Sequence, residues 1–228
     1  DFYLEMVNPQ DRGQYRRDTP EGLAYLPFDV RRERIKIKDA TDQFFDIRST
    51  VHGPVISDIY PTDAIVNNQV ISMRWTGHEI SHEIKSMYEI NWSTNIESFQ
   101  NALKDYGAPG QNIMYADNSG NIAMFSAAKL PIRKYDPLLL RPGWDQGYDW
   151  QSWIPFEELP TIINPKKGWI ANANNKITTD AYPHYIASFW EPPSRIQRIE
   201  ELITADSLFS MDIVAEHQTD VFSHFASS

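Results

Sequence analysis

The stretch Asn112–Phe125 (NIMYADNSGNIAMF) contains two runs of strand-forming residues separated by Asp117, Asn118, Ser119 and Gly120. These residue types favour tight turns, because the polar side chains bond the local backbone and glycine tolerates positive φ. The stretch therefore predicts a β-hairpin. The two strands of a hairpin run antiparallel, so we expect antiparallel sheet here.

Other segments also show the period of two that is typical of strands. Arg34–Lys38 and Phe45–Val51 alternate apolar and polar residues, which predicts two half-buried strands. We expect these two strands to be neighbours in an antiparallel sheet. Ala64–Val66 and Val70–Trp75 continue the β pattern along the chain.

Three segments change to the helical period, and they are Glu79–Ile90, Ser93–Leu103 and Ser194–Leu202. In the first, Ile80, Ile84 and Met87 recur at steps of four and three, which predicts one buried helix face. In the second, Ser93 is a good N-cap. A mostly antiparallel sheet with flanking helices is an α+β arrangement.

The composition is that of an ordinary globular protein. The 228 residues are 41% hydrophobic and carry a formal net charge of −10, so we expect one domain over 1–228 and no nucleic-acid partner. The sequence contains no run of eighteen apolar residues, so we predict no membrane-spanning helix. The chain contains no cysteine, which excludes disulfide and thiol chemistry. Asp1–Leu4 is patterned like the inside of an element, so we interpret the chain as a fragment of a longer protein.

One short motif suggests a metal site. His78-Glu79-Ile-Ser-His82 matches the zinc-peptidase pattern of two histidines one helical turn apart with a glutamate between them. The predicted helix places both histidines opposite its apolar face, which favours a solvated polar surface instead. A zinc metallopeptidase that uses His78, Glu79 and His82 is therefore the weaker hypothesis.

The stretch Gly168–Lys176 (GWIANANNK) begins like a buried strand and then holds three asparagines in four residues. In a strand, Asn172 and Asn174 point to the same face. A buried amide without partners costs about 1–3 kcal/mol, so such a pair indicates either a polar network in the core or a site that binds a carbonyl or an amine. The pattern by itself leaves both interpretations open.

A family resemblance favours the second interpretation. The landmarks, in chain order, are Thr50–Pro54 (TVHGP), Tyr115–Ile122 (YADNSGNI), Pro155–Glu157, Gly168–Asn175, Tyr182–Pro183 and Arg195–Ile199 (RIQRI). In this order, over nearly the whole chain, they resemble the catalytic chain of penicillin acylases, which are N-terminal-nucleophile hydrolases. The resemblance implies a four-layer αββα sandwich, of which this chain is a part, and hydrolysis of a linear amide in an N-acyl amine. It also implies a second chain from the same precursor and a periplasmic or extracellular location.

The resemblance also implies roles for individual residues. In the family an N-terminal serine, exposed by self-cleavage, attacks the amide with its own α-amine as base, and no cofactor takes part. By position, Asn174 donates to the oxyanion and Arg195 orients it. Gln111 falls in the acyl pocket, and Asn172 is a supporting amide near the substrate.

Calcium is a further implication of the resemblance. Family members bind it through acidic residues and backbone carbonyls, and Asp1 and Pro137 match two of those positions. His184 falls near a third position, where the family has an acid, and a histidine is a poor ligand for a hard cation.

Two hypotheses from different classes follow. The first is a fragment of an amidohydrolase that is inactive alone, because nothing in it can be the N-terminal nucleophile. The alternative is a non-catalytic ligand-binding domain on the same scaffold, in which the aromatic-rich crossing Trp144–Trp153 holds the ligand.

Overall fold

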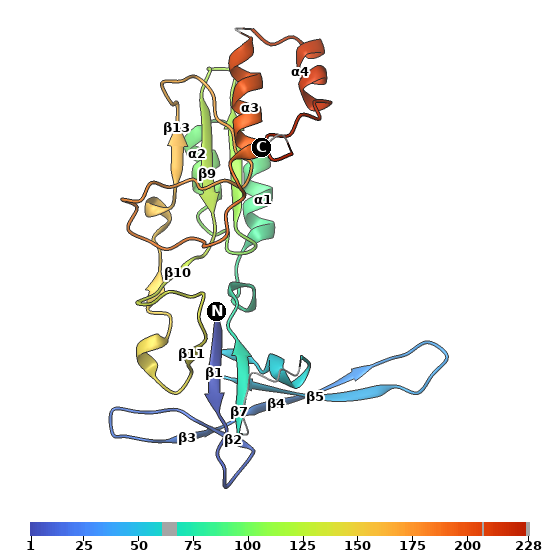
Figure 1. Cartoon of the computed structure of the whole chain (residues 1–228), viewed down its shortest axis with the longest axis vertical. Helices are drawn as coiled ribbons and strands as arrows, with labels where there is room; N and C mark the ends of the chain where they lie inside the picture. Colours follow the sequence, from blue (N-terminus) through green and yellow to red (C-terminus); the bar gives the residue numbers. More distant parts are fainter. Residues whose placement is uncertain (61–67, 207, 227–228) are drawn as a thin grey trace. The chain divides into compact units, whose positions relative to one another are not determined.

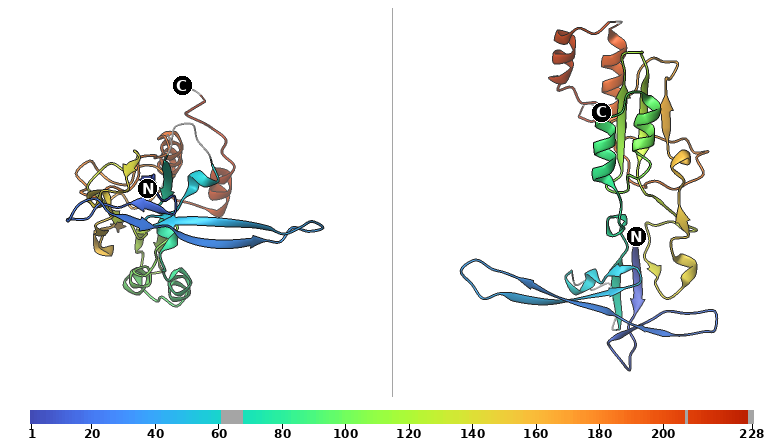
Figure 2. Two further views of the ribbon diagram at one scale, coloured as in Figure 1. Left: turned by 90° about the horizontal axis from the view of Figure 1, so that it is seen from below. Right: turned by 180° about the vertical axis from the view of Figure 1, so that it is seen from behind.

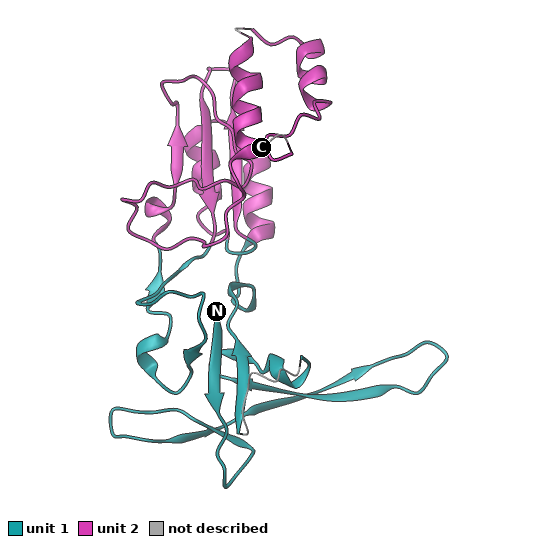
Figure 3. Cartoon of the chain, viewed as in Figure 1, with its two compact units in different colours: residues 1–82, 107–109, 129–154 teal, residues 83–106, 110–128, 155–228 magenta. Residues whose placement is uncertain are grey.

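The computed structural model describes residues 1–60, 68–206 and 208–226. The chain divides into two compact units (Figure 3). Unit 1 comprises residues 1–82, 107–109 and 129–154, and unit 2 comprises residues 83–106, 110–128 and 155–228. The single domain predicted over 1–228 stays a prediction.

Unit 1 is built of short strands. β1 (Phe2–Met6) pairs antiparallel with β7 (Gln69–Met73) and parallel with β11 (Arg141–Pro142). The remaining small pairs are β2 (Gln14–Arg16) with β3 (Tyr25–Pro27) and β10 (Pro131–Ile132) with β12 (Ser152–Trp153). The described part of unit 1 also contains three 3₁₀ turns, namely η1 (Ile56–Asp58), η2 (Thr76–His78) and η3 (Gln146–Tyr148). An apolar cluster holds the strands together, and its buried members are Val7, Tyr15, Phe28, Val55 and Val70.

A long two-stranded ribbon belongs to the same unit (Figure 2). β4 (Asp29–Ile35) pairs antiparallel with β5 (Gln43–Thr50), and β5 pairs with the short β6 (Gly53–Pro54). The predicted antiparallel neighbours are confirmed, but the predicted bounds of the first strand are wrong, because only Arg34 and Ile35 of Arg34–Lys38 lie in β4. The predicted half-burial is largely wrong, since Ile35 and Phe45 are 52% and 45% exposed, although Ile47 is half-buried. Alternation predicts the strand period, but it does not predict whether another layer covers the apolar face.

The β pattern at Val70–Trp75 forms most of β7. The pattern predicted at Ala64–Val66 lies outside the described residues. No helix in the described part of the chain is long and apolar enough to cross a membrane.

A buried polar cluster lies between the strands of unit 1. His52 Nδ1 lies 2.8 Å from Glu5 Oε1, and His52 Nε2 lies 3.0 Å from Asp149 Oδ1. Tyr3 stacks on the imidazole at 3.7 Å between ring centroids, and Arg17 forms an ion pair with Asp149. Glu5 is fully buried and His52 is 2% exposed. The imidazole therefore joins two carboxylates in the interior.

Glycine is required at one point beside this cluster. A Cβ atom on Gly143 would lie 2.1 Å from Glu5 Oε2. Such a separation is a severe clash, and the carboxylate is buried, so it has no solvent to move into. The close approach of the backbone to Glu5 therefore depends on the missing side chain.

Unit 2 contains a three-stranded antiparallel sheet in the order β13 (Thr161–Ile163), β9 (Ile122–Ala127) and β8 (Gln111–Ala116). Helices lie along this sheet (Figure 1). The central strand β9 is the most buried of the three, and the core cluster joins it to residues 96–106, which are a helix over 96–102 and the turn that follows it. Its buried members are Phe99, Leu103, Tyr106, Ala123, Phe125 and Ala127.

The predicted hairpin is confirmed as β8 and β9, and Asp117 organises its turn. The Asp117 carboxylate accepts the backbone N–H groups of Ser119 (2.8 Å) and Asn121 (3.0 Å). It also accepts the Asn121 amide (2.9 Å) and the Tyr115 hydroxyl (2.8 Å). The hydrogen bonds from Asn121, foremost that of its side chain, hold the pKa of Asp117 at about 2.

The first predicted helix needs correction. α1 runs over Glu83–Asn91, so it begins four residues later than the prediction. Ile80 and Ile84 are 90% and 85% exposed, whereas Ser86 is fully buried. Ser86 is small, so the helix can approach its neighbours closely on that side. The sequence period was helical, but the apolar stripe faces away from the core of unit 2.

The second predicted helix is confirmed with a different start. α2 (Ile96–Ala102) begins after Asn95, whose side chain accepts the Ser98 N–H in a capping box. Ser93 is not the N-cap, because its hydroxyl donates to Ile90 O at the end of α1 (2.7 Å). The predicted third helix is α3 (Ser194–Ala205), followed by α4 (Met211–Gln218). A 3₁₀ turn, η4 (Phe156–Glu158), precedes β13.

Candidate active site

The segment Gly168–Lys176 is not a strand. It consists of turns and irregular backbone, and Asn174 has a left-handed φ of +61°. Two asparagine side chains bond the nearby backbone. Asn172 Oδ1 accepts the Asn174 N–H (3.2 Å), and Asn175 Oδ1 accepts the Ala173 N–H (3.0 Å). These bonds compete with a strand ladder, which explains why the predicted strand is wrong.

Asparagine suits the backbone position of residue 174. Left-handed conformations cost most residues energy, but asparagine tolerates them. In the resulting turn Asn174 is exposed to solvent, whereas the neighbouring Ala173 is only 5% exposed. The local sequence therefore places the Asn174 side-chain amide at the surface of unit 2, on a turn that the Asn172 side chain stabilises.

Arg195 contacts this amide from the first turn of α3. Its Nη2 donates to Asn174 Oδ1 at 3.0 Å and to Ala173 O at 2.8 Å. A guanidinium group has donors only, so the amide atom that faces it must be the oxygen. The two residues that the sequence placed in one site are therefore brought together here.

This contact fixes which way the amide is turned. With Oδ1 on Arg195, the Nδ2 group of Asn174 faces away from the guanidinium, and within the described residues Nδ2 has no hydrogen-bond partner. A donor pair held in one orientation and free of other bonds can stabilise a negatively charged oxygen. The arrangement is thus chemically suited to bind an oxyanion or a carbonyl.

Glu191 was not predicted from the sequence. Its backbone N–H donates to Asn174 O (3.1 Å), and its carboxylate lies 3.6 Å from Arg195 Nη2. The one available signal was the spacing of four residues between an acid and an arginine, which is common on helix surfaces and has little specificity. Glu191 therefore contacts both residues of the predicted pair.

The two predicted substrate-binding residues lie differently. Asn172 uses its side-chain oxygen for the Asn174 N–H, and its Nδ2 is buried without a partner among the described atoms. Gln111 is exposed at the start of β8, opposite Ala127. Substrate contacts by Asn172 and Gln111 stay predictions.

The family model described as penicillin amidase matches residues 1–228. The chain belongs to the penicillin amidase family. Members of this family are amidohydrolases, and the predicted resemblance is confirmed.

Individual members of the penicillin amidase family match nearly all of the chain. It is 29% identical over 224 residues to the penicillin acylase 2 proenzyme of Pseudomonas sp. strain SE83, with 98% of this chain and 28% of that protein covered. It is 24% identical over 216 residues to the acyl-homoserine lactone acylase QuiP of Pseudomonas fluorescens Pf-5, with 94% of this chain and 26% of that protein covered. The chain thus spans about a quarter of the length of these relatives.

A solved penicillin amidase structure has the same fold. The thermostable penicillin G acylase from Alcaligenes faecalis matches with a TM-score of 0.77 and 25% identity, over 95% of this chain and 38% of that chain. The predicted α+β class is confirmed: helices and antiparallel sheet combine as in part of an N-terminal-nucleophile hydrolase.

The penicillin amidase resemblance implies a calcium ion held by Asp1 and Pro137. The Asp1 carboxylate accepts Arg133 Nε (2.7 Å) and Nη2 (2.9 Å), Trp150 Nε1 (2.6 Å) and the Tyr135 hydroxyl (3.2 Å). Pro137 lies in a turn of unit 1. Calcium takes six to eight oxygen ligands, and no three acidic or histidine side chains cluster for a metal among the described residues. These residues do not by themselves fit a calcium ion.

Three histidines were considered as metal ligands from the sequence, namely His184 for calcium and His78 and His82 for zinc. His184 Nε2 lies 2.6 Å from Glu158 Oε2. His78 ends the 3₁₀ turn η2 and packs edge-on against Trp75, whereas His82 precedes α1. The two histidines of the zinc-peptidase pattern therefore do not lie one turn apart on a helix, because the predicted helix begins at Glu83, after both of them.

The aromatic crossing has cationic partners within the chain. The contacts to ring centroids are Arg16 to Trp144 (5.7 Å), Arg74 to Trp150 (4.5 Å) and Lys129 to Trp153 (4.5 Å). A ligand held on these rings would compete with the chain's own cations.

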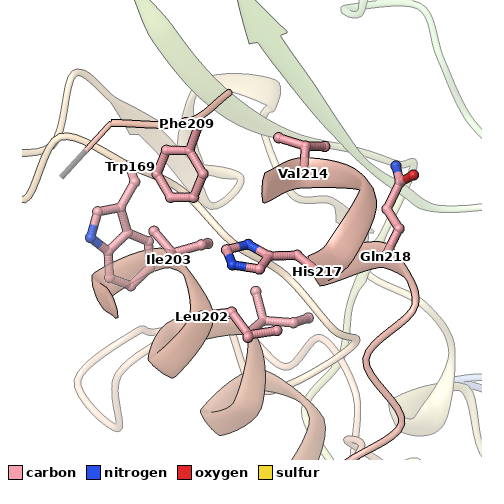
Figure 4. A pocket seen from close by; sticks show the side chains of 8 residues that line it. Trp169, Leu202, Ile203, Phe209, Val214, His217 and Gln218 are labelled. Carbon is pink, nitrogen blue, oxygen red and sulfur yellow. The ribbon is translucent and has the colours of Figure 1, made fainter. Parts of the chain in front are cut away.

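A separate apolar cleft lies between α3 and α4 (Figure 4). Its volume is about 420 Å³, and its lining residues are Trp169, Ile199, Leu202, Ile203, Phe209, Val214, His217 and Gln218. Neither Asn174 nor Arg195 lines this cleft.

Proposed function

We propose that this chain is part of the catalytic chain of an amidohydrolase that cleaves linear N-acyl amines to a carboxylate and an amine. The observation that carries the proposal is the Asn174 amide, whose oxygen is held by Arg195 and whose nitrogen is unpartnered among the described residues. Membership of the penicillin amidase family supports it. The proposed substrates are penicillins, acyl-homoserine lactones or related N-acyl amines.

In the proposed reaction a nucleophile outside this chain attacks the amide carbonyl. The carbonyl oxygen gains negative charge, and Asn174 Nδ2–H donates to it. The amine leaves with a proton, and water then hydrolyses the acyl-enzyme to release the acid. The Asn174 donor is more strongly bound to the charged oxygen than to the neutral carbonyl, so it lowers the barrier and not only the substrate Kd.

The proposed nucleophile is an N-terminal serine, threonine or cysteine exposed by cleavage of a precursor. One relative is named a proenzyme, which supports a precursor with a second chain. Residues 1–228 alone are then inactive. No metal or cofactor takes part in the proposed chemistry, and the proposed location is the periplasm or the exterior of the cell.

The hydrogen bond from Arg195 to Asn174 Oδ1, here called the clamp, can be tested by substitution of Arg195. Arg195→Ala removes the charged donor to Asn174 Oδ1, and a hydrogen bond to a charged group contributes about 1.5–3 kcal/mol. We expect kcat of the complete mature protein on its best N-acyl amine to fall about 10- to 100-fold. Amine release at saturating substrate measures this.

Arg198→Ala is the matched control, one turn along α3. Arg198 pairs with Asp220 (2.7 Å) and Glu201 (3.0 Å) and contacts neither Asn174 nor Ala173. We expect its kcat to stay within about twofold of wild type, because exposed ion pairs contribute little. Equal losses in both variants would show a general effect of removing an arginine from α3 and would contradict the proposed clamp.

A further inference from the structure

The acid four residues before Arg195 contacts the candidate site at two points. Glu191 Oε2 lies 3.6 Å from Arg195 Nη2, the same nitrogen that donates to Asn174 Oδ1 and to Ala173 O. The Glu191 backbone N–H donates to Asn174 O at 3.1 Å. A single residue therefore touches both the guanidinium and the backbone that carries the amide.

The guanidinium needs such support. Arg195 and Glu191 side chains are 54% and 51% exposed, so neither is held by burial. An exposed arginine has many rotamers, and water competes for its donors. The carboxylate lowers the energy of the rotamer that also places Nη2 on Asn174 Oδ1, because the attraction acts on the same nitrogen.

We infer that Glu191 is a positioning residue for the oxyanion donor, acting on Asn174 through Arg195. This inference rests on the proposed amidohydrolase function. Glu191 acts indirectly. Its carboxylate contacts the Arg195 guanidinium, which donates to Asn174 Oδ1, and in the proposed reaction only Asn174 Nδ2 contacts the substrate. Its effect is on the population of the correct amide orientation.

A purely structural role gives different results. An exposed ion pair contributes about 0–1 kcal/mol, so a structural Glu191 changes neither folding nor turnover measurably. The backbone bond to Asn174 O does not depend on the side chain, so Glu191→Gln removes the charge and keeps that bond. The substitution therefore isolates the carboxylate.

The experiment compares kcat and KM of the complete mature protein for wild type, Glu191→Gln and Glu191→Asp. Glu157→Gln is the matched control, because Glu157 is an exposed acid of unit 2 in an ion pair with Lys104 at 3.7 Å. We expect Glu191→Gln to lower kcat about three- to fivefold with KM and Tm unchanged, since fivefold corresponds to ~1 kcal/mol. Glu191→Asp should recover part of the loss.

Salt provides a second readout. The Debye length falls from about 30 Å at 0.01 M to about 3 Å at 1 M ionic strength, so an exposed pair is screened. We expect the ratio of wild-type to Glu191→Gln kcat to approach one at high salt. A structural role leaves the ratio constant.

The outcomes distinguish a failure of the inference about Glu191 from a failure of the proposed function. If wild type is active, Asn174→Ala is inactive and Glu191→Gln equals Glu157→Gln in kcat, the inference about Glu191 is overturned and the proposed function stands. If wild type hydrolyses no N-acyl amine, the proposed function is overturned, and this inference with it.

Discussion

Asn174→Ala is expected to lower kcat of the complete mature protein about 100- to 1000-fold. Removal of one oxyanion donor typically costs about 2.7–4 kcal/mol of barrier, and Asn174 is the residue whose Nδ2 is oriented by Arg195 and unpartnered among the described residues. KM should change much less, because the donor acts on charge that develops in the transition state. Steady-state hydrolysis of an N-acyl amine measures both constants.

Asn175→Ala is the matched control for this prediction. Asn175 is the next residue, and its Oδ1 accepts the Ala173 N–H, so its loss perturbs the same turn without removing the proposed donor. We expect a loss of kcat of at most about tenfold. A urea unfolding curve for each variant shows that the fold persists. Near-normal turnover in Asn174→Ala would remove this residue from the mechanism.

His52→Ala is expected to lower the free energy of unfolding by about 3–5 kcal/mol. The imidazole lies between two carboxylates, 2.8 Å from Glu5 Oε1 and 3.0 Å from Asp149 Oδ1, and Glu5 is fully buried. Removing the imidazole takes one hydrogen-bond partner from each carboxylate, and a buried polar group that loses its partner costs about 1–3 kcal/mol. The stacked ring of Tyr3 also loses its neighbour at 3.7 Å.

The loss is large compared with a typical stability of about 5–15 kcal/mol. Glu5 Oε1 keeps two donors in the variant, the hydroxyls of Thr50 (2.9 Å) and Ser72 (2.7 Å), so the loss comes from the imidazole contacts alone. Urea unfolding measures the difference. His82→Ala is the control, because His82 is exposed, and we expect a change within about 0.5 kcal/mol. A loss below about 1 kcal/mol in His52→Ala would contradict the buried-cluster account.

The parts of the fold that the sequence predicted well are those with local causes. The hairpin at Asn112–Phe125 depends on turn chemistry, and Asp117 bonds its own turn at four points. The pairing of β4 with β5 follows from two adjacent alternating segments. In each case the information lies within a few residues of the element.

The wrong predictions concern what covers each element. Ile80 and Ile84 have the helical spacing of a buried face, yet the fully buried residue of α1 is Ser86. Ile35 and Phe45 belong to segments that alternate as half-buried strands do, yet they are 52% and 45% exposed. Period alone predicts the element type, whereas burial depends on packing partners that the local pattern does not encode.

The candidate site depended on another source of information. Asn174 and Arg195 were paired by the family resemblance, since they lie 21 positions apart in the sequence and no period relates them. The predicted strand around Asn174 was wrong because the amides of Asn172 and Asn175 bond the local backbone. Glu191 has only a common helical spacing, so no sequence pattern singled it out.

We propose that this chain belongs to a self-processed amidohydrolase in which Asn174 serves a nucleophile outside residues 1–228. The most direct test is N-terminal sequencing, with intact mass, of the natural mature protein. The account predicts a mature chain that starts with serine, threonine or cysteine upstream of Asp1 and includes Asn174 and Arg195. A mature chain that starts at or near Asp1 would leave Asn174 with no nucleophile to serve and would contradict the account.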